Sequence, residues 1–228
     1  MKYRDKKSEI NCCNCDLFRT CPIFENADEN NNIVKKGIIV ARNQDIYKAG
    51  QPFTSFAIVR SGLLKSWNVN KDGKEGISSF FLQGDLIGVD VVYNEKHIST
   101  ITALTNTEIC TISSDELKKL FQTNMVAFNR GLWLVSRYIS FRHYLLLVDT
   151  EKRLAGFLYE IIMRLQLIKN NVVKLPIKQI DMASHLNLSP ETINRTLRRW
   201  EEKGVISGMR NKQFLINDIN ILKDISSN

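Results

Sequence analysis

The chain has 228 residues, enough for two ordinary domains, and 43% of them are hydrophobic, so a full core can be buried. Its start, MKYRDKKSEI, lacks the apolar stretch of a secretory signal, and no apolar run is long enough to cross a bilayer. These features predict a cytoplasmic protein with no membrane partner, in which thiols stay reduced. The net charge is +8, of which +7 lies in residues 115–228. A basic half indicates an anionic partner, nucleic acid first, and the alternative is a solvated Lys/Arg surface.

Residues 1–32 are polar, end in the loop-like run ENADENNN and contain four of the five cysteines. These are Cys12, Cys13, Cys15 and Cys21, whereas the fifth, Cys110, stands far downstream. Three close thiols and one remote thiol match the general plan of iron–sulfur cluster ligation. The candidate set is Cys12, Cys15, Cys21 and Cys110, with Cys13 as a substitute for the first. Four thiolates suit a [4Fe–4S] cluster or a tetrahedral zinc ion, although structural zinc usually draws on two cysteine pairs. The plainer alternative is a tail with incidental thiols and Cys110 as a small core residue.

From residue 33 to about 112 the sequence is typical of a small β-domain. Seven of the eleven glycines lie between Gly37 and Gly88. Short β-branched and aromatic runs, such as GIIVA, FAIVRSG, ISSFFL and EICTI, recur between turn signals. This pattern predicts a β-barrel or sandwich.

At Ser113 the pattern becomes helical, because serines followed by two acidic residues precede an apolar-periodic run. The helical pattern continues to about residue 169, apart from a break near Thr123–Asn124. Leu132, Val135 and Ile139 then mark the apolar stripe of a long helix over 124–149. This stripe needs a partner surface, which a second copy in a homodimer would supply. The alternative is packing against the chain's own β-domain.

The segment IKQIDMASHLNLSPETINRTLRRWEEKGVI predicts a helix-turn-helix. A first helix is expected over 178–186, with Asn187 in a tight turn. Ser189 and Pro190 suit the cap and first position of a second helix. That helix buries Ile193, Leu197 and Trp200. Strands at 205–206 and 214–216 would form a wing with a basic tip.

Another face of the second helix carries side chains that can read base edges in a major groove. Glu191, Asn194, Arg195 and Arg198 share this face, and Ser189 and Thr192 at the helix start complete the candidate DNA-binding set. The alternative is a solvated basic face in which Glu191 pairs with Arg195.

Taken together, these residues resemble the CRP/FNR superfamily of transcription regulators, in its FNR branch. The resemblance rests on CCNCDLFRTC, LQGDLIGVDVVYNEKHISTITALTNTEICTI, EKRLAGFLYEI and LSPETINRTLRRWEEKGVI, and it covers nearly the whole chain. It implies an α+β fold: a β-roll sensor domain over 33–123, a dimerisation helix over 124–149 and a winged helix-turn-helix over 150–228. It also implies a [4Fe–4S] cluster on Cys12, Cys15, Cys21 and Cys110, oxygen sensing, a palindromic DNA site, and contact with RNA polymerase to activate or repress genes.

Two departures from the family pattern stand out. Cys13 is an extra thiol beside the first ligand, and Asn194 replaces the serine of the pattern Glu-x-x-Ser-Arg. Cyclic AMP is not expected, because the phosphate pocket would have Asp85 in place of glutamate and no arginine occurs between Arg60 and Arg130. A haem or nitric-oxide sensor of this fold is an alternative, but it would give the four cysteines no function. An enzyme is disfavoured because no histidine neighbours a cysteine in the sequence, and the three histidines are expected at the surface or in local hydrogen bonds.

Overall fold

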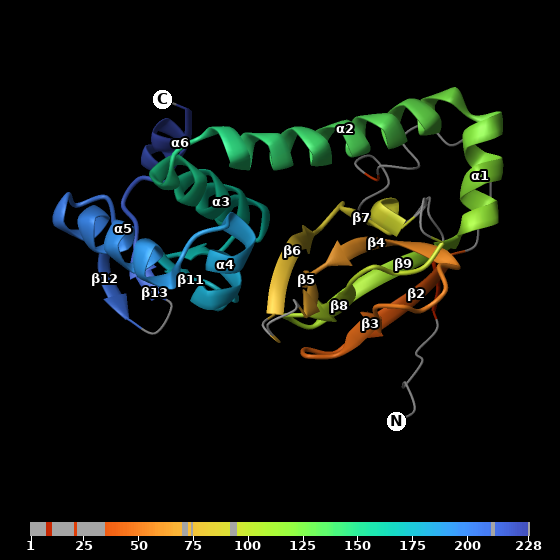
Figure 1. The fold of residues 1–228 in the computed structure, drawn as a ribbon, viewed down its shortest axis with the longest axis horizontal. Coiled ribbons are helices and arrows are strands. Elements are labelled where there is room, and N and C mark those ends of the chain that lie inside the picture. The colour runs from red at the N-terminus through yellow and green to blue at the C-terminus, as the bar shows by residue number, and fades with distance from the viewer. Residues whose placement is uncertain are drawn as a thin grey trace. The chain divides into compact units, whose positions relative to one another are not determined.

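The computed structural model describes residues 8–10, 21, 35–69, 73, 75–91, 95–210 and 213–227. The chain divides into two compact units, one formed by residues up to 68 with 79–140, and the other by residues 69–78 with 141–228. Figure 1 shows the first unit as strands with the helices that follow them up to residue 140, and the second mainly as short helices with a small sheet.

The first unit is built on two antiparallel sheets, which confirms the predicted β-roll. One sheet has the order β1-β2-β9-β4-β7, and the other has the order β3-β8-β5-β6. The strands are β1 (Ser8–Ile10), β2 (Lys35–Val40), β3 (Asp45–Tyr47), β4 (Ser55–Ser61), β5 (Leu63–Val69), β6 (Glu75–Leu82), β7 (Leu86–Ile87), β8 (Thr100–Ala103) and β9 (Thr107–Ser113), with a short 3-10 helix, η2 (Val89–Val91).

Alternation along these strands gives the roll its interior. Successive side chains of a strand point to opposite faces of the sheet. On β9, Ile109 joins an apolar cluster with Val59, Leu64 and Ile101, whereas Cys110 and its neighbours on the opposite face join a separate cluster. Each face of the β9 sheet is therefore packed, and the side chains of β9 are divided between two cores.

Two helices follow β9. α1 (Ser114–Thr123) begins with a capping box in which the Ser113 hydroxyl accepts from the Glu116 N–H, and the Glu116 carboxylate accepts from the Ser113 N–H. The predicted break is present at Asn124, whose side-chain oxygen accepts from the Ala127 N–H at the start of the next helix. α2 (Met125–Leu147) is that helix, and it agrees closely with the predicted long helix.

In the second unit, Asp149 caps α3 (Thr150–Arg164) by accepting from the Lys152 N–H at 3.0 Å, and this hydrogen bond lowers the pKa of Asp149. The other elements are β10 (Ile168–Lys169), β11 (Val172–Lys174), α4 (Gln179–Leu186), α5 (Pro190–Glu202), β12 (Ser207–Arg210), β13 (Gln213–Leu215) and α6 (Asn220–Ser227).

Two details of the second unit differ from the sequence prediction. The helix was expected to continue to about residue 169, but α3 ends at Arg164 and a β-hairpin follows. Asn170 and Asn171 form its turn with φ of 51° and 62°, the left-handed conformation that two-residue hairpin turns require. The first wing strand lies at Ser207–Arg210, after the predicted residues 205–206, and pairs with Gln213–Leu215.

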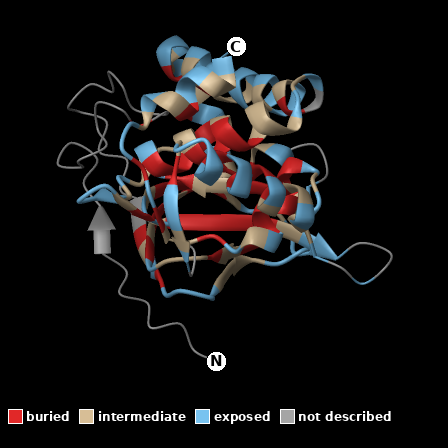
Figure 2. Ribbon diagram, turned by 90° about the vertical axis from the view of Figure 1, so that its left-hand side faces the viewer, coloured by how far each residue is buried: buried red, intermediate tan, exposed pale blue. Residues whose placement is uncertain are grey.

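Buried residues lie in the interior of each unit, while the outward faces of the helices are largely exposed (Figure 2). Two histidines are among the buried residues, which rules out the surface alternative of their expectation and leaves the hydrogen-bonding one. His97 is 3% exposed and stacks on Tyr47 with ring centroids 4.1 Å apart, and His185 is 7% exposed against Phe157. Within the described part of the chain, no helix is long and apolar enough to cross a membrane.

Candidate DNA-reading helix and thiol site

The helix-turn-helix predicted from the sequence is confirmed in the second unit. α4 begins at Gln179, and Asn187 ends it in the left-handed region with φ of 54° and ψ of 47°. Asparagine tolerates this conformation better than most residues. The Ser189 hydroxyl accepts from the Thr192 N–H at 3.1 Å, and Pro190 takes the first helical position of α5. The turn and the cap together fix where α5 starts.

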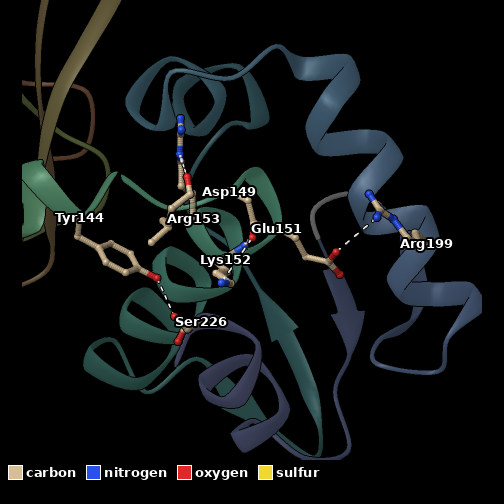
Figure 3. Close-up of polar contacts among 8 residues, drawn as sticks. Tyr144, Asp149, Glu151, Lys152, Arg153, Arg199 and Ser226 are labelled. Atoms are coloured by element: carbon tan, nitrogen blue, oxygen red, sulfur yellow. Dashed lines mark hydrogen bonds and ion pairs between the residues drawn. The ribbon is translucent and has the colours of Figure 1, made fainter. Parts of the chain in front are cut away.

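The inner face of α5 is anchored to α3. Trp200 is fully buried, and its indole N–H donates to the Glu151 carboxylate at 2.7 Å. The other oxygen of Glu151 accepts from the Arg199 guanidinium at 3.4 Å, as Figure 3 shows. Ile193 and Leu197 complete the predicted apolar stripe. One carboxylate at the start of α3 thus holds the last turns of α5.

α3 also holds the end of α4. The Arg153 guanidinium donates to the Val148 carbonyl at 2.8 Å and to the Leu186 carbonyl at 3.4 Å. Carbonyls in the last turn of a helix lack partners within the helix, so an arginine is a suitable donor for Leu186. Tyr144 of α2 is fixed in the same unit, because its hydroxyl donates to the Ser226 carbonyl at 2.9 Å (Figure 3).

The outer face of α5 carries the predicted reading residues. Glu191, Arg195 and Arg198 are exposed, whereas Asn194 is half-buried. The pKa of Glu191 lies below its ordinary value, because backbone and Ser189 hydrogen bonds favour the carboxylate form. Glu191 is therefore an acceptor, and the two arginines are donors, as base-edge contacts require.

Ser189 and Thr192 have a different local environment. Their hydroxyls lie 3.0 Å apart, and the Ser189 oxygen is used in the helix cap. Both side chains therefore stabilise the start of α5. Any contact that they make with DNA, as predicted, would come in addition to this capping role.

The thiol site belongs to the first unit. Cys21 and Cys110 are 8% and 7% exposed, and both belong to one apolar cluster. Cys110 lies on β9, opposite Gly37 of β2 and Ile58 of β4. Two candidate ligands that are 89 positions apart in the sequence thus share one core. The remaining candidates, Cys12, Cys13 and Cys15, lie outside the described residues, and within the described part no group of three or more metal-binding side chains occurs.

This cluster is covered by the helices that follow β9. Leu117 and Leu120 of α1 and Ala127 of α2 belong to it, and Phe121 packs against it. Gly131 of α2 lies so close to Phe121 that a β-carbon there would be 2.7 Å from the ring. The thiols are therefore adjacent to the junction between α1 and α2.

Two residues that position the reading helix were missed by sequence reasoning. Glu151 holds Trp200, and Gln179 at the start of α4 donates from its side-chain amide to the Asn194 side-chain oxygen at 2.8 Å. Neither contact follows from periodicity or helix capping, because each joins residues on different helices.

Comparison with known proteins agrees with this architecture. Residues 38–124 match the cyclic nucleotide-binding domain family, and residues 152–225 match the Crp-like helix-turn-helix domain family. Among solved structures, FixK2 from Bradyrhizobium japonicum superposes with a TM-score of 0.70 and 20% identity, covering 86% of this chain and 99% of that chain.

Two curated relatives are similar over nearly their full length. The anaerobic regulatory protein of Aggregatibacter actinomycetemcomitans is 31% identical, over 95% of this chain and 88% of the relative. The fumarate and nitrate reduction regulatory protein of Yersinia pestis is 28% identical, over 96% of this chain and 91% of the relative. The β-roll, the helix-turn-helix and these relatives together place the chain in the CRP/FNR superfamily of transcription regulators, in its FNR branch.

Proposed function

We propose that this DNA-binding regulator responds to oxygen or redox state through a [4Fe–4S] cluster held by Cys12, Cys15, Cys21 and Cys110. The observation that carries the proposal is the meeting of Cys21 and Cys110 in one buried cluster. Relatives named as anaerobic and as fumarate and nitrate reduction regulators support the same response.

The residues around the two thiols suit this cofactor. Thiolates are soft ligands that bind iron–sulfur clusters. Their neighbours Phe56, Ile58 and Ile112 are buried and apolar, and an apolar shell limits the access of water and tunes a metal centre. When bound, a [4Fe–4S] cluster would supply an oxygen-labile, redox-active centre that ties the N-terminal segment to β9.

The position of Cys110 suggests how ligation would reach the long helix. Cys110 lies three residues before Ser113, the cap of α1, and shares a core with Ala127 near the start of α2. To shift the equilibrium between an inactive and a DNA-binding state from 1:99 to 99:1, the cluster must bind the favoured state about 5.5 kcal/mol more tightly than the other. Binding through four thiolate ligands would supply energy of that order, whereas one surface thiol would not.

The same proposal includes a homodimer formed along α2. Met125, Leu132 and Ile139 recur every seven residues and are 66%, 54% and 48% exposed. Phe128 and Val135 occupy the intermediate positions of the same heptad. Such a stripe is the pattern of a two-helix coiled coil, and a second copy of α2 would cover it.

The expected functional division is a cysteine segment over 1–32, a sensor domain over 33–123, a dimerisation helix over 124–149 and a DNA-binding domain over 150–228. We further propose that the dimer binds a palindromic site through α5 and contacts RNA polymerase. The missing arginine in the phosphate pocket argues against cyclic AMP as the effector.

The test is an absorption spectrum of protein purified without oxygen, with iron and sulfide analysis, before and after exposure to air. Cys110→Ser and Cys21→Ser are expected to lose the visible band and specific DNA binding, because each removes one of four ligands. Cys13→Ser is the matched control, and it is expected to keep both.

Cys110→Ser with full iron and sulfide and wild-type DNA binding would refute the proposal. A colourless wild-type protein with one zinc ion per chain would replace the cluster by a structural zinc site. A cluster lost in Cys13→Ser and kept in Cys12→Ser would move the first ligand by one residue.

A further inference from the structure

The amide of Asn194 is held from the neighbouring helix. Gln179 Nε2 of α4 donates to Asn194 Oδ1 of α5 at 2.8 Å, and both side chains are half-buried. Asn194 lies on the same face of α5 as Glu191, Arg195 and Arg198. Among the hydrogen bonds of the described residues, Asn194 uses its side-chain oxygen and leaves its side-chain nitrogen for a ligand.

This hydrogen bond bears on which base Asn194 can read. The usual contact of asparagine with adenine is bidentate: the amide oxygen accepts from N6 and the amide nitrogen donates to N7. In this protein the Gln179 side chain lies against the oxygen and takes one of its two lone pairs, so the NH2 end is the freer end of the group. An NH2 group finds an acceptor at purine N7, guanine O6 and thymine O4, whereas the major-groove edge of cytosine presents only the N4 donor.

We propose that Gln179 is a specificity-determining residue that orients Asn194 to donate to a base acceptor in the major groove and so to disfavour cytosine, which has none. This inference rests on the proposed reading role of α5 and adds the base class to it. Gln179 acts through Asn194 and is a positioning residue. Because Gln179 is on the first helix of the motif, the two helices jointly set one position of the half-site.

The experiment measures binding of the full-length protein, prepared without oxygen, at one fixed salt concentration. A half-site library identifies the position at which Asn194→Ala relaxes base preference. Four duplexes that differ only at that position are then compared. The wild type is expected to disfavour cytosine against the other three bases by at least about fivefold, a typical lower value for one base contact.

Two substitutions separate orientation from simple packing. Gln179→Leu keeps a similar volume and removes the donor, so the preference at this position is expected to fall while the other positions keep theirs. Gln179→Glu replaces the donor by an acceptor that bonds the Asn194 NH2 group and turns its oxygen outward. Cytosine, whose N4 donates to that oxygen, should then be favoured over guanine and thymine, even though the added negative charge weakens binding to all four duplexes.

The double variant provides the internal control. In an Asn194→Ala background, Gln179→Leu is expected to leave the ratios among the four duplexes unchanged. Lys178→Ala, at the exposed neighbouring position, should weaken all four duplexes equally or not at all.

Equal weakening of all four duplexes by Gln179→Leu, repeated in the Asn194→Ala background, would overturn the inference. Gln179 would then contact only the DNA phosphate backbone. An unchanged library profile in Asn194→Ala would also overturn it, while Glu191 and Arg195 could still read bases. A wild type that does not distinguish specific from scrambled duplexes would instead refute the reading role of α5.

Discussion

The hydrogen bond between Glu151 and Trp200 gives a sharp test of how α5, the candidate DNA-reading helix, is held. Trp200 is 0% exposed, so its indole N–H depends on Glu151 as its acceptor. Glu151→Ala removes that acceptor, and a buried donor left unsatisfied costs about 1–3 kcal/mol. The ion pair with Arg199 adds little, since the Arg199 side chain is 45% exposed and exposed pairs contribute about 0–1 kcal/mol.

Glu151→Gln is the matched control for this prediction. Its amide oxygen still accepts from the indole, while the charge, the ion pair and the favourable position at the start of α3 are lost in both variants. We therefore expect Glu151→Ala to lose about 1–3 kcal/mol more unfolding free energy than Glu151→Gln. The difference between the two variants isolates the indole hydrogen bond.

The assay is urea unfolding followed by tryptophan emission. The chain has three tryptophans, so a Trp67→Phe, Trp133→Phe background leaves Trp200 as the reporter of the second unit. With a slope of about 1–3 kcal/mol per molar urea, the two midpoints should differ by roughly 1 M. Equal midpoints for Glu151→Ala and Glu151→Gln would contradict the anchoring role of Glu151.

Three further predictions follow from other contacts. Burial, then the nearby Arg142 charge, lowers the pKa of His185 to about 4, so between pH 6.5 and 4 the unfolded chain binds a proton that the folded chain excludes. The unfolding free energy of the second unit should be full above pH 6.5 and fall by about 3 kcal/mol as the pH approaches 4, and His185→Gln should flatten this profile in urea titrations. Gly131→Ala should cost about 1–3 kcal/mol through its contact with Phe121, and Phe121→Leu should restore much of the loss in thermal unfolding. Leu132→Asp should shift the dimer to monomer in sedimentation, because it puts a charge in the exposed stripe, and an unchanged dimer would exclude that stripe from the interface.

The local features of the helix-turn-helix in the second unit could be predicted from the sequence because short-range chemistry determines them. Ser189, Pro190 and Asn187 each suit one backbone position, and the structure has all three in those positions. The same short-range chemistry gave a wrong prediction at Asn170 and Asn171, which were expected to follow the end of a helix and form a hairpin turn instead. Asparagines with positive φ occur both at helix ends and in hairpin turns. The two cases differ only in whether the flanking residues pair as strands, as β10 and β11 do here.

The contacts that hold the candidate sites could not be predicted, since they depend on packing between elements. Glu151 lies 49 positions from Trp200, and no periodic pattern connects the two residues. The burial of His97 and His185 was missed for a similar reason. A single histidine carries no pattern of its own, and its environment is set by aromatic neighbours such as Tyr47 and Phe157.

Cys110 lies on one face of β9, and this face determines which neighbouring elements a change at its thiol would affect. Successive residues of a strand face opposite sides, so a shift of one position would have put Cys110 among the inner residues with Ile109. Its actual face shares a core with Ile112, Leu117 and Ala127, under α1 and the start of α2. A change of ligation at Cys110 would therefore act first on the packing of these helices, while the interior of the roll stays intact. This arrangement would couple the proposed thiol centre to the long helix without requiring the β-roll to unfold.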